Sequence, residues 1–195
     1  MQQRTEEWHS ARRGMITASR FGDVLADPKT KRYQEYLEET IFKIKGVPDF
    51  DDDDKPWFEH GIRLEPEARG RYEWEADVEV EEVGFIVHPK YDFIGCSPDM
   101  LIQPEGGGEI KGHVSLKAFL AAESRPHGKG VPPDHKPQVQ GSLWITGRKW
   151  WDYVSYYSNN GKSMIHIRRV VPDVPYIKRL EAACLEFWGK VQEGL

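Results

Sequence analysis

The spacing of apolar residues changes from a helical period to an alternating one near residue 77 of this chain. Before that point, intervals of three and four residues predict a helix that ends at Gly46 and contains Tyr33, Tyr36, Leu37, Ile41 and Ile44. After it, alternation predicts a strand through Val78, Val80, Val83, Phe85 and Val87. Helices followed by a cluster of strands and then by mixed elements imply an α/β (mixed α+β) fold, with a central mixed β-sheet flanked by helices.

The same criteria place the remaining elements. Further helices are predicted from Thr17 to about Ala26, Pro56 to Trp74, Ser115 to Ser124, Pro137 to Thr146 and Val174 to Gln192. Further strands are predicted at Asp92–Cys96, Met100–Ile102, Glu109–Lys111, Trp151–Tyr157 and Met164–Val171. Pro66 is expected to kink or bend its helix, and Gly106 to Gly108 to form a turn.

Length and composition limit the class of protein. A chain of 195 residues with 38% hydrophobic residues is expected to form a single domain, residues 1–195, with a sizeable core. We expect a cytoplasmic protein with no membrane partner, because no apolar run reaches membrane-spanning length and the first residues do not resemble a signal peptide. The net charge of -5 argues against a simple coat on nucleic acid, because such proteins are usually basic. Cys96 and Cys184 are expected to be reduced thiols.

A short acidic stretch runs from Asp49 to Asp54 and is followed by Lys55 and Pro56. We interpret it as a solvated loop that caps the next helix. Its role beyond that stays open.

The densest chemical signal is Asp99, which precedes Glu109 and Lys111 across a glycine-rich segment. Residues two apart in a strand face the same side, so Glu109 and Lys111 project together while Ile110 faces the core. A hairpin brings Asp99 beside that pair. Two carboxylates that converge on one sheet face suit Mg²⁺ or Mn²⁺, and the lysine would orient or activate an attacking water. On composition alone, such a turn is more often a solvated hairpin, but the ordered pattern D-x(9)-E-x-K matches the PD-(D/E)xK nucleases.

Other residues on either side add to this signal. Glu65 is predicted on the same helix face as Arg69 and is either a surface carboxylate or a further acid of the metal site. Arg12, near the hydroxyl-rich segment that ends at Ser19, suits a phosphate. Gln138 begins a further helix.

These motifs occur in a fixed order, as W-x(3)-R-x-G-x-I-T-A-S, G-x(3)-E-x(2)-A-R, C-S-P-D, E-I-K and Q-V-Q-x(2)-L-W-x-T. The set, which spans Trp8 to about Tyr157, resembles the lambda exonuclease family, also called YqaJ-like viral recombinases or phage alkaline exonucleases. The resemblance implies a restriction-endonuclease-like core.

The resemblance also implies roles for individual residues. Asp99, Glu109, Glu65 and the backbone carbonyl of Ile110 match metal ligands, with two Mg²⁺ per site expected and Mn²⁺ as a substitute. Lys111 matches the catalytic lysine.

Three other matches lie around that centre. Gln138 matches a glutamine at the edge of the site, with Gln140 as a supporting residue. Arg12 and Ser19 match residues that bind the 5′-phosphate of the substrate. Arg13 adjoins Arg12, but the distances to Trp8 and Ser19 favour Arg12, and whether Arg13 shares the role stays open.

The implied activity is a Mg²⁺-dependent 5′ to 3′ exonuclease that degrades one strand of linear duplex DNA to mononucleotides and leaves a 3′ single-stranded tail. By resemblance, the protein forms a ring-shaped homotrimer, works with a single-strand annealing protein, and acts in a bacterial host with a phage or prophage as its source. Two alternatives stay open: a structure-specific endonuclease of the same superfamily and a non-catalytic DNA-end-binding scaffold.

Two other kinds of site are less favoured. The aromatic residues of the segment 150–157 resemble a base-stacking platform, but their alternation favours packing in the core. The scattered histidines lack zinc-ligand spacing.

Overall fold

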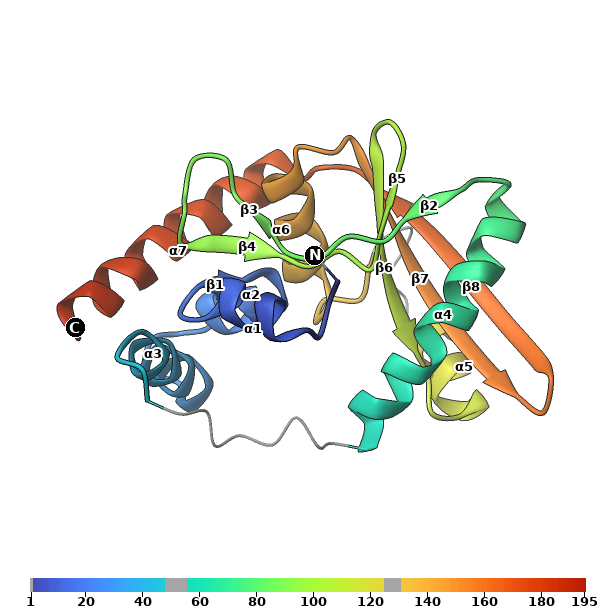
Figure 1. Ribbon diagram of the computed structural model, residues 1–195, viewed down its shortest axis with the longest axis horizontal. Helices are drawn as coiled ribbons and strands as arrows, with labels where there is room; N and C mark the ends of the chain where they lie inside the picture. Colours follow the sequence, from blue (N-terminus) through green and yellow to red (C-terminus); the bar gives the residue numbers. More distant parts are fainter. Residues whose placement is uncertain (1, 48–55, 125–130) are drawn as a thin grey trace.

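The computed structural model describes residues 2–47, 56–124 and 131–195, which form two β-sheets with helices packed around them (Figure 1). The small sheet has the strand order β1-β4-β3 and comprises Ile16–Thr17, Ile94–Cys96 and Ile86–Val87. The large sheet has the order β2-β5-β6-β7-β8 and comprises Val80–Glu81, Met100–Ile102, Gly106–Gly112, Trp150–Asn159 and Lys162–Val170. The helices are α1 (Glu6–Arg12), the 3₁₀ helix η1 (Ala18–Arg20), α2 (Phe21–Val24), α3 (Lys31–Ile44), α4 (Pro56–Ala76), α5 (Leu116–Ser124), α6 (Lys136–Thr146) and α7 (Val174–Glu193).

Both sheets are mixed. Strand β1 pairs parallel with β4, and β6 pairs parallel with β7, whereas the other strand pairs are antiparallel. A parallel pair needs a crossover connection, and α5 and α6 lie in the segment that joins β6 to β7. The predicted mixed α/β fold with flanking helices is confirmed, although the strands divide between two sheets.

Helices cover both faces of the large sheet. Leu64, Ala68 and Tyr72 of α4 pack against the face that carries Ile110 and Val154. The opposite face carries Leu101, Trp151 and Tyr153, which pack against Val139 and Leu143 of α6. The expectation that the aromatic residues of β7 belong to the core is confirmed for its buried members Trp151, Tyr153 and Tyr156.

A separate core lies beside the small sheet. Tyr33 and Tyr36 of α3 contact Phe187 of α7, with ring centroids 5.2 Å apart in each pair. Phe21 of α2 and Ile94 of β4 are fully buried in the same cluster. Helix α6 contacts both sheets, through β4 on one side and β7 on the other, so it lies between the two halves (Figure 1).

Three local predictions need correction. The alternating segment from Val78 to Val87 forms two short strands, β2 and β3, which belong to different sheets. The predicted helix from Thr17 is split into η1 and α2, and α1 was not predicted. Gly106 to Gly108 are the first residues of β6 and not a turn.

The glycines lie in this strand because of what packs beside them. A Cβ atom at Gly106 would lie 2.2 Å from the ring of Trp150, and one at Gly107 would lie 2.3 Å from the ring of Trp151. Larger residues are therefore excluded by their neighbours in β7. The chain turns instead between β5 and β6, at residues 103–105.

The remaining expectations concern two helices, the cysteines, membrane-spanning helices and the acidic stretch. The helix predicted before Gly46 is α3, and the helix predicted from Pro56 is α4, which contains Pro66. The bend expected at Pro66 stays a prediction. Both cysteines are buried and free, and no helix in the described part of the chain combines the length and apolar character needed to cross a bilayer. The acidic stretch from Asp49 to Asp54 lies outside the described residues.

Candidate active site

The hairpin of β5 and β6 brings Asp99 beside Glu109. Met100 pairs with Gly108 in antiparallel register, and Oδ2 of Asp99 accepts a hydrogen bond of 2.6 Å from the backbone N–H of Ile110. The side chain of Ile110 packs in the core beneath α4, so Glu109 and Lys111 share the opposite face, as strand alternation predicts. The predicted convergence of Asp99, Glu109 and Lys111 is therefore observed.

Glu109, Lys111 and Gln138 form a closed set of contacts. Nζ of Lys111 donates to Oε1 of Glu109 at 2.7 Å and to Oε1 of Gln138 at 3.2 Å. Nε2 of Gln138 donates to the same Glu109 oxygen at 2.6 Å. Gln138 lies on the first turn of α6, so this helix carries a polar group to the sheet face that bears the carboxylates. The second glutamine, Gln140, is buried and instead contacts the backbone of residues 171 and 173.

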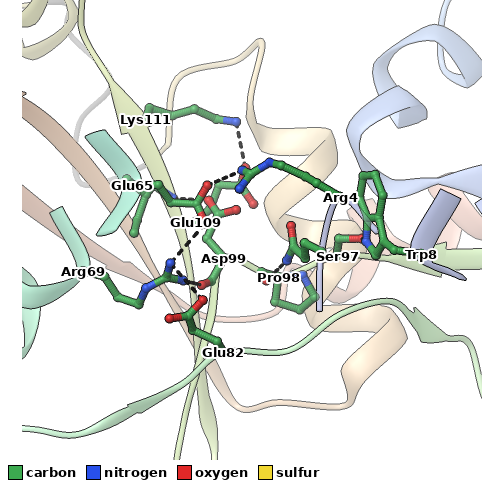
Figure 2. Close-up of polar contacts among 12 residues, drawn as sticks. Arg4, Trp8, Glu65, Arg69, Glu82, Ser97, Pro98, Asp99, Glu109 and Lys111 are labelled. Atoms are coloured by element: carbon green, nitrogen blue, oxygen red, sulfur yellow. Dashed lines mark hydrogen bonds and ion pairs between the residues drawn. The ribbon is translucent and has the colours of Figure 1, made fainter. Parts of the chain in front are cut away.

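Glu65 reaches the same region from α4. Its Oε2 accepts from Nη2 of Arg4 at 2.5 Å, and its Oε1 lies 3.4 Å from Nη2 of Arg69 (Figure 2). Arg69 also donates to the backbone oxygen of Asp99 at 2.5 Å, so it joins α4 to the hairpin. The role of Arg4 was not predicted, because no sequence spacing connects the N-terminal segment with residue 65.

The electrostatic balance of the site follows from burial and from these contacts. Burial raises the pKa of the Asp99 carboxyl well above its usual range, and the nearby carboxylates of Glu109 and Glu65 raise it further. Burial alone would lower the pKa of the Lys111 ammonium, but Glu109 and Asp99 outweigh that effect and raise it. The site therefore holds Lys111 charged, and its buried carboxylates repel one another, a repulsion that an added cation would relieve.

The residues present fit a divalent metal through Asp99 and Glu109. Oε2 of Glu109 is buried and has no hydrogen-bond partner in the described part of the chain, although its other oxygen has two. A buried charged oxygen without a partner is costly, and a hard cation would satisfy it. Among residues 2–47, 56–124 and 131–195, no three acidic, histidine or cysteine side chains already surround one metal position. Arginines face both oxygens of Glu65.

The predicted phosphate-binding residues lie in the N-terminal segment, Arg12 in α1 and Ser19 in η1. The guanidinium of Arg12 lies 3.9 Å above the ring of Trp8, and Nε1 of Trp8 donates to Oγ of Ser97 at 2.9 Å. Ser97 is two residues from Asp99, so one aromatic side chain connects Arg12 with the segment that carries Asp99. Ser19 is exposed in η1, with its hydroxyl 3.2 Å from that of Thr17.

The neighbouring arginine is placed differently. Arg13 is exposed at the C-terminal cap of α1, whereas Arg12 is partly buried against Trp8.

Two further groups beside the site were missed. Tyr153 pairs in register with Glu109 across β6 and β7, and its hydroxyl lies 2.6 Å from Nδ1 of His135. Burial raises the pKa of Tyr153 to about 12. Burial, aided by the charge of Lys111, lowers the pKa of His135 to about 4. Strand alternation indicated the side on which Tyr153 lies, but nothing in the sequence connected it with His135.

Comparisons with known proteins identify the family and the fold of this chain. A family model described as the YqaJ-like viral recombinase domain matches residues 7–149. A search of curated proteins finds no match.

Solved structures give closer detail. The crystal structure of an alkaline exonuclease, LHK-Exo, from Laribacter hongkongensis is 31% identical, with a TM-score of 0.81 over 97% of this chain and 93% of that one. The same protein in complex with dAMP matches with a TM-score of 0.82 at equal identity and coverage. A phage related exonuclease from Haemophilus somnus 129PT is 12% identical over 92% of this chain and 94% of that one, with a TM-score of 0.70, and it shares the fold.

Proposed function

Because this chain belongs to the family of YqaJ-like viral recombinase domains, we propose that it is a Mg²⁺-dependent exonuclease that digests one strand of linear duplex DNA from the 5′ end. It is a deoxyribonuclease of the phage recombination type, with the mixed α/β fold of the alkaline exonuclease. The observation that carries the finer proposal is the convergence of Asp99, Glu109 and Lys111 on one hairpin, with one buried Glu109 oxygen left without a partner.

Each residue of the cluster has a chemical task in this proposal. Asp99, Glu109 and the carbonyl of Ile110 would hold a divalent metal, and Glu65 would help to hold another. Such ions polarise the phosphodiester and supply a nucleophilic water at neutral pH. Lys111 is held charged by its carboxylate neighbours, so it would orient the water and balance the negative charge of the transition state. Gln138, which contacts both Lys111 and Glu109, fixes their relative positions.

The choice of strand would depend on the N-terminal segment. Arg12 and Ser19 are proposed to bind a 5′-phosphate, since a guanidinium gives forked donors to a phosphate and a hydroxyl adds another. The Trp8 indole, which contacts both Arg12 and Ser97, would keep this anchor at a fixed place relative to Asp99. Product release as mononucleotides agrees with the dAMP complex of the alkaline exonuclease.

The remaining parts of the proposal rest on family resemblance. A ring-shaped homotrimer would enclose the duplex and resist dissociation between cleavage steps. A 3′ single-stranded tail would pass to a single-strand annealing protein for recombination. A location in the cytoplasm of a bacterial host, with Mn²⁺ as a substitute for Mg²⁺, also remains a prediction.

One experiment tests the central proposal. Linear duplex DNA labelled at either the 5′ or the 3′ end is incubated with the protein, with and without Mg²⁺. We expect a labelled mononucleotide to leave the 5′ end first, and only when Mg²⁺ is present. Asp99→Ala and Lys111→Ala should each lower the rate by about a thousandfold or more. The matched control is Lys149→Ala, since Lys149 is 70% exposed and pairs only with Glu105 among its ion-pair partners in the described chain.

The same assay separates the alternatives. Cleavage of circular duplex would indicate an endonuclease, and binding of DNA ends without Mg²⁺-dependent cleavage would indicate a scaffold. Circular dichroism shows whether each active-site variant is folded. A variant that digests DNA at the normal rate would refute the role assigned to its residue.

A further inference from the structure

The N-terminal segment contacts the carboxylate cluster through Arg4. Nη2 of Arg4 lies 2.5 Å from Oε2 of Glu65, and the Arg4 side chain is 39% exposed whereas that of Glu65 is 11% exposed. The neighbouring Gln3 fixes the segment, because its Nε2 donates to the backbone oxygens of Val83 at 2.9 Å and Pro98 at 2.7 Å. Pro98 precedes Asp99, so the segment is fastened directly beside the active-site hairpin (Figure 2).

The backbone of Arg4 has an uncommon conformation. Its φ angle is +68°, a left-handed value that costs a residue with a side chain on the order of 1 kcal/mol more than it costs glycine. The next residue, Thr5, caps α1 by accepting from the backbone N–H of Trp8 at 3.3 Å. Between the Gln3 anchor and this cap, Arg4 is held in the conformation that directs its guanidinium to Glu65.

This contact places a cation on an oxygen that the proposed metal site needs. Glu65 has Arg4 at one oxygen and Arg69 at the other. A divalent ion requires the same carboxylate lone pairs, and a guanidinium beside it would repel it. Asp99 and Glu109 carry no such arginine on their carboxylate oxygens among the described contacts, so of the three carboxylates Glu65 is the one held by arginines.

We propose that Arg4 is an internal counter-ion of Glu65 that competes with the divalent metal for this carboxylate and thereby weakens metal binding in the DNA-free protein. The proposal rests on the proposed function, because it requires that Glu65 is a metal ligand. Arg4 is thus a positioning residue: it holds Glu65 in place while no metal is bound, and it leaves that oxygen when a metal binds.

The test measures metal binding without DNA or catalysis. Mn²⁺ binding to the whole protein is followed by electron paramagnetic resonance, which counts the free ion. Arg4→Gln removes the charge and should lower the dissociation constant for Mn²⁺ by about fivefold, the effect of one partly exposed ion pair. Arg4→Lys keeps the charge and should bind Mn²⁺ as the unchanged protein does.

Two variants separate charge from backbone strain and from a general change in surface charge. Arg4→Gly relieves the positive φ as well as the charge, so it should tighten Mn²⁺ binding as much as Arg4→Gln does. Arg71→Gln removes an arginine from the same helix as Glu65, where it pairs with Glu75 at 3.0 Å, and should leave the constant unchanged.

The outcomes distinguish failure of this inference from failure of the proposed function. If Asp99→Ala abolishes Mn²⁺ binding but Arg4→Gln leaves it unchanged or weakens it, the counter-ion role is wrong and the metal site stands. If neither the unchanged protein nor Arg4→Gln binds Mn²⁺, both proposals are wrong. Equal tightening by Arg71→Gln would also overturn the inference, because it would show a nonspecific effect of net charge.

Discussion

Around the large sheet the protein buries charged side chains, whereas the core beside the small sheet is built from apolar and aromatic side chains. Glu65, Arg69, Glu109 and Asp152 are all buried around the large sheet. Asp152 is fully paired, since it accepts from Tyr72 at 2.6 Å and from two nitrogens of Arg169 at 2.8 Å each. Glu109 differs, because one of its oxygens has no partner in the described chain.

The buried polar residues beside the small sheet are uncharged or weakly basic. They are Thr17, Thr40 and His88. Charged groups on that side, such as the pair of Arg20 and Glu39, keep partial contact with solvent. Burying a charged group costs free energy unless the group is paired or binds a ligand. The difference between the two halves therefore indicates that they have different roles. In the proposed function, the large sheet carries the catalytic residues, and the N-terminal elements near the small sheet carry the residues that bind the substrate.

The largest predicted effect is a loss of folding stability when the packing of the large sheet is disturbed. Gly107→Ala places a Cβ atom against the fully buried ring of Trp151 and should lower the free energy of unfolding by about 3 kcal/mol. Urea denaturation measures the change. Gly61→Ala is the matched control, because among the described residues no atom outside the local helix backbone lies within 4 Å of a Cβ at that position in α4, and alanine favours the helix. A Gly107→Ala protein as stable as the control would contradict the packing described here.

A smaller effect should appear when the pH is lowered. Burial keeps His135 neutral, and its pKa of about 4 lies below the ordinary 6.5. The unfolded chain therefore binds more protons than the folded protein between these values, so stability falls as the pH drops from about 6.5 towards about 4. The loss from this residue should reach about 2 kcal/mol.

The variant His135→Gln checks that expectation. It should remove this part of the loss, which urea denaturation at pH 7 and pH 4.5 would detect. His9→Gln, at an exposed position on α1, serves as the control. An unchanged difference between the two pH values in His135→Gln would show that other groups account for the acid sensitivity of the large-sheet side.

The smallest predicted effect is on the rate of DNA digestion and concerns Arg12, which lies in the N-terminal elements. Arg12→Ala should slow digestion of duplexes with a 5′-phosphate by about tenfold and leave 5′-hydroxyl ends nearly unaffected, because one charge-assisted contact is lost. Rates on both substrates are measured in parallel, with Arg13→Ala at the exposed neighbouring position as the control. Equal losses on the two ends would assign Arg12 a structural role against Trp8.

Much of the catalytic cluster followed from local rules. Strand alternation placed Glu109 and Lys111 on one face, and a short hairpin placed Asp99 beside them. These relations involve neighbours in sequence, so period and turn length determine them. The helices with clear apolar periods, α3 and α7, were also predicted closely for the same reason.

What the sequence did not predict depends on contacts between distant residues. The pairing of Arg4 with Glu65 and that of His135 with Tyr153 each join separate elements, and no spacing encodes them. The glycines of β6 were assigned to a turn because glycine favours turns. Their place in a strand depends on the rings of Trp150 and Trp151, which follow much later in the chain.

Those glycines also limit how the gene can change. Every glycine codon begins with two guanines, so a mutation at either of these bases replaces the glycine. At Gly106 and Gly107 such a replacement would place a side chain against a tryptophan ring, so only the third base can change without that cost. Gly108 is less restricted, because a Cβ there would meet the unbranched side chain of Met100, its terminal methyl at 2.2 Å and its Cγ at 2.9 Å, and no aromatic ring is among the three nearest atoms. A library of random mutations selected for DNA digestion should therefore recover substitutions at Gly108 sooner than at either glycine before it.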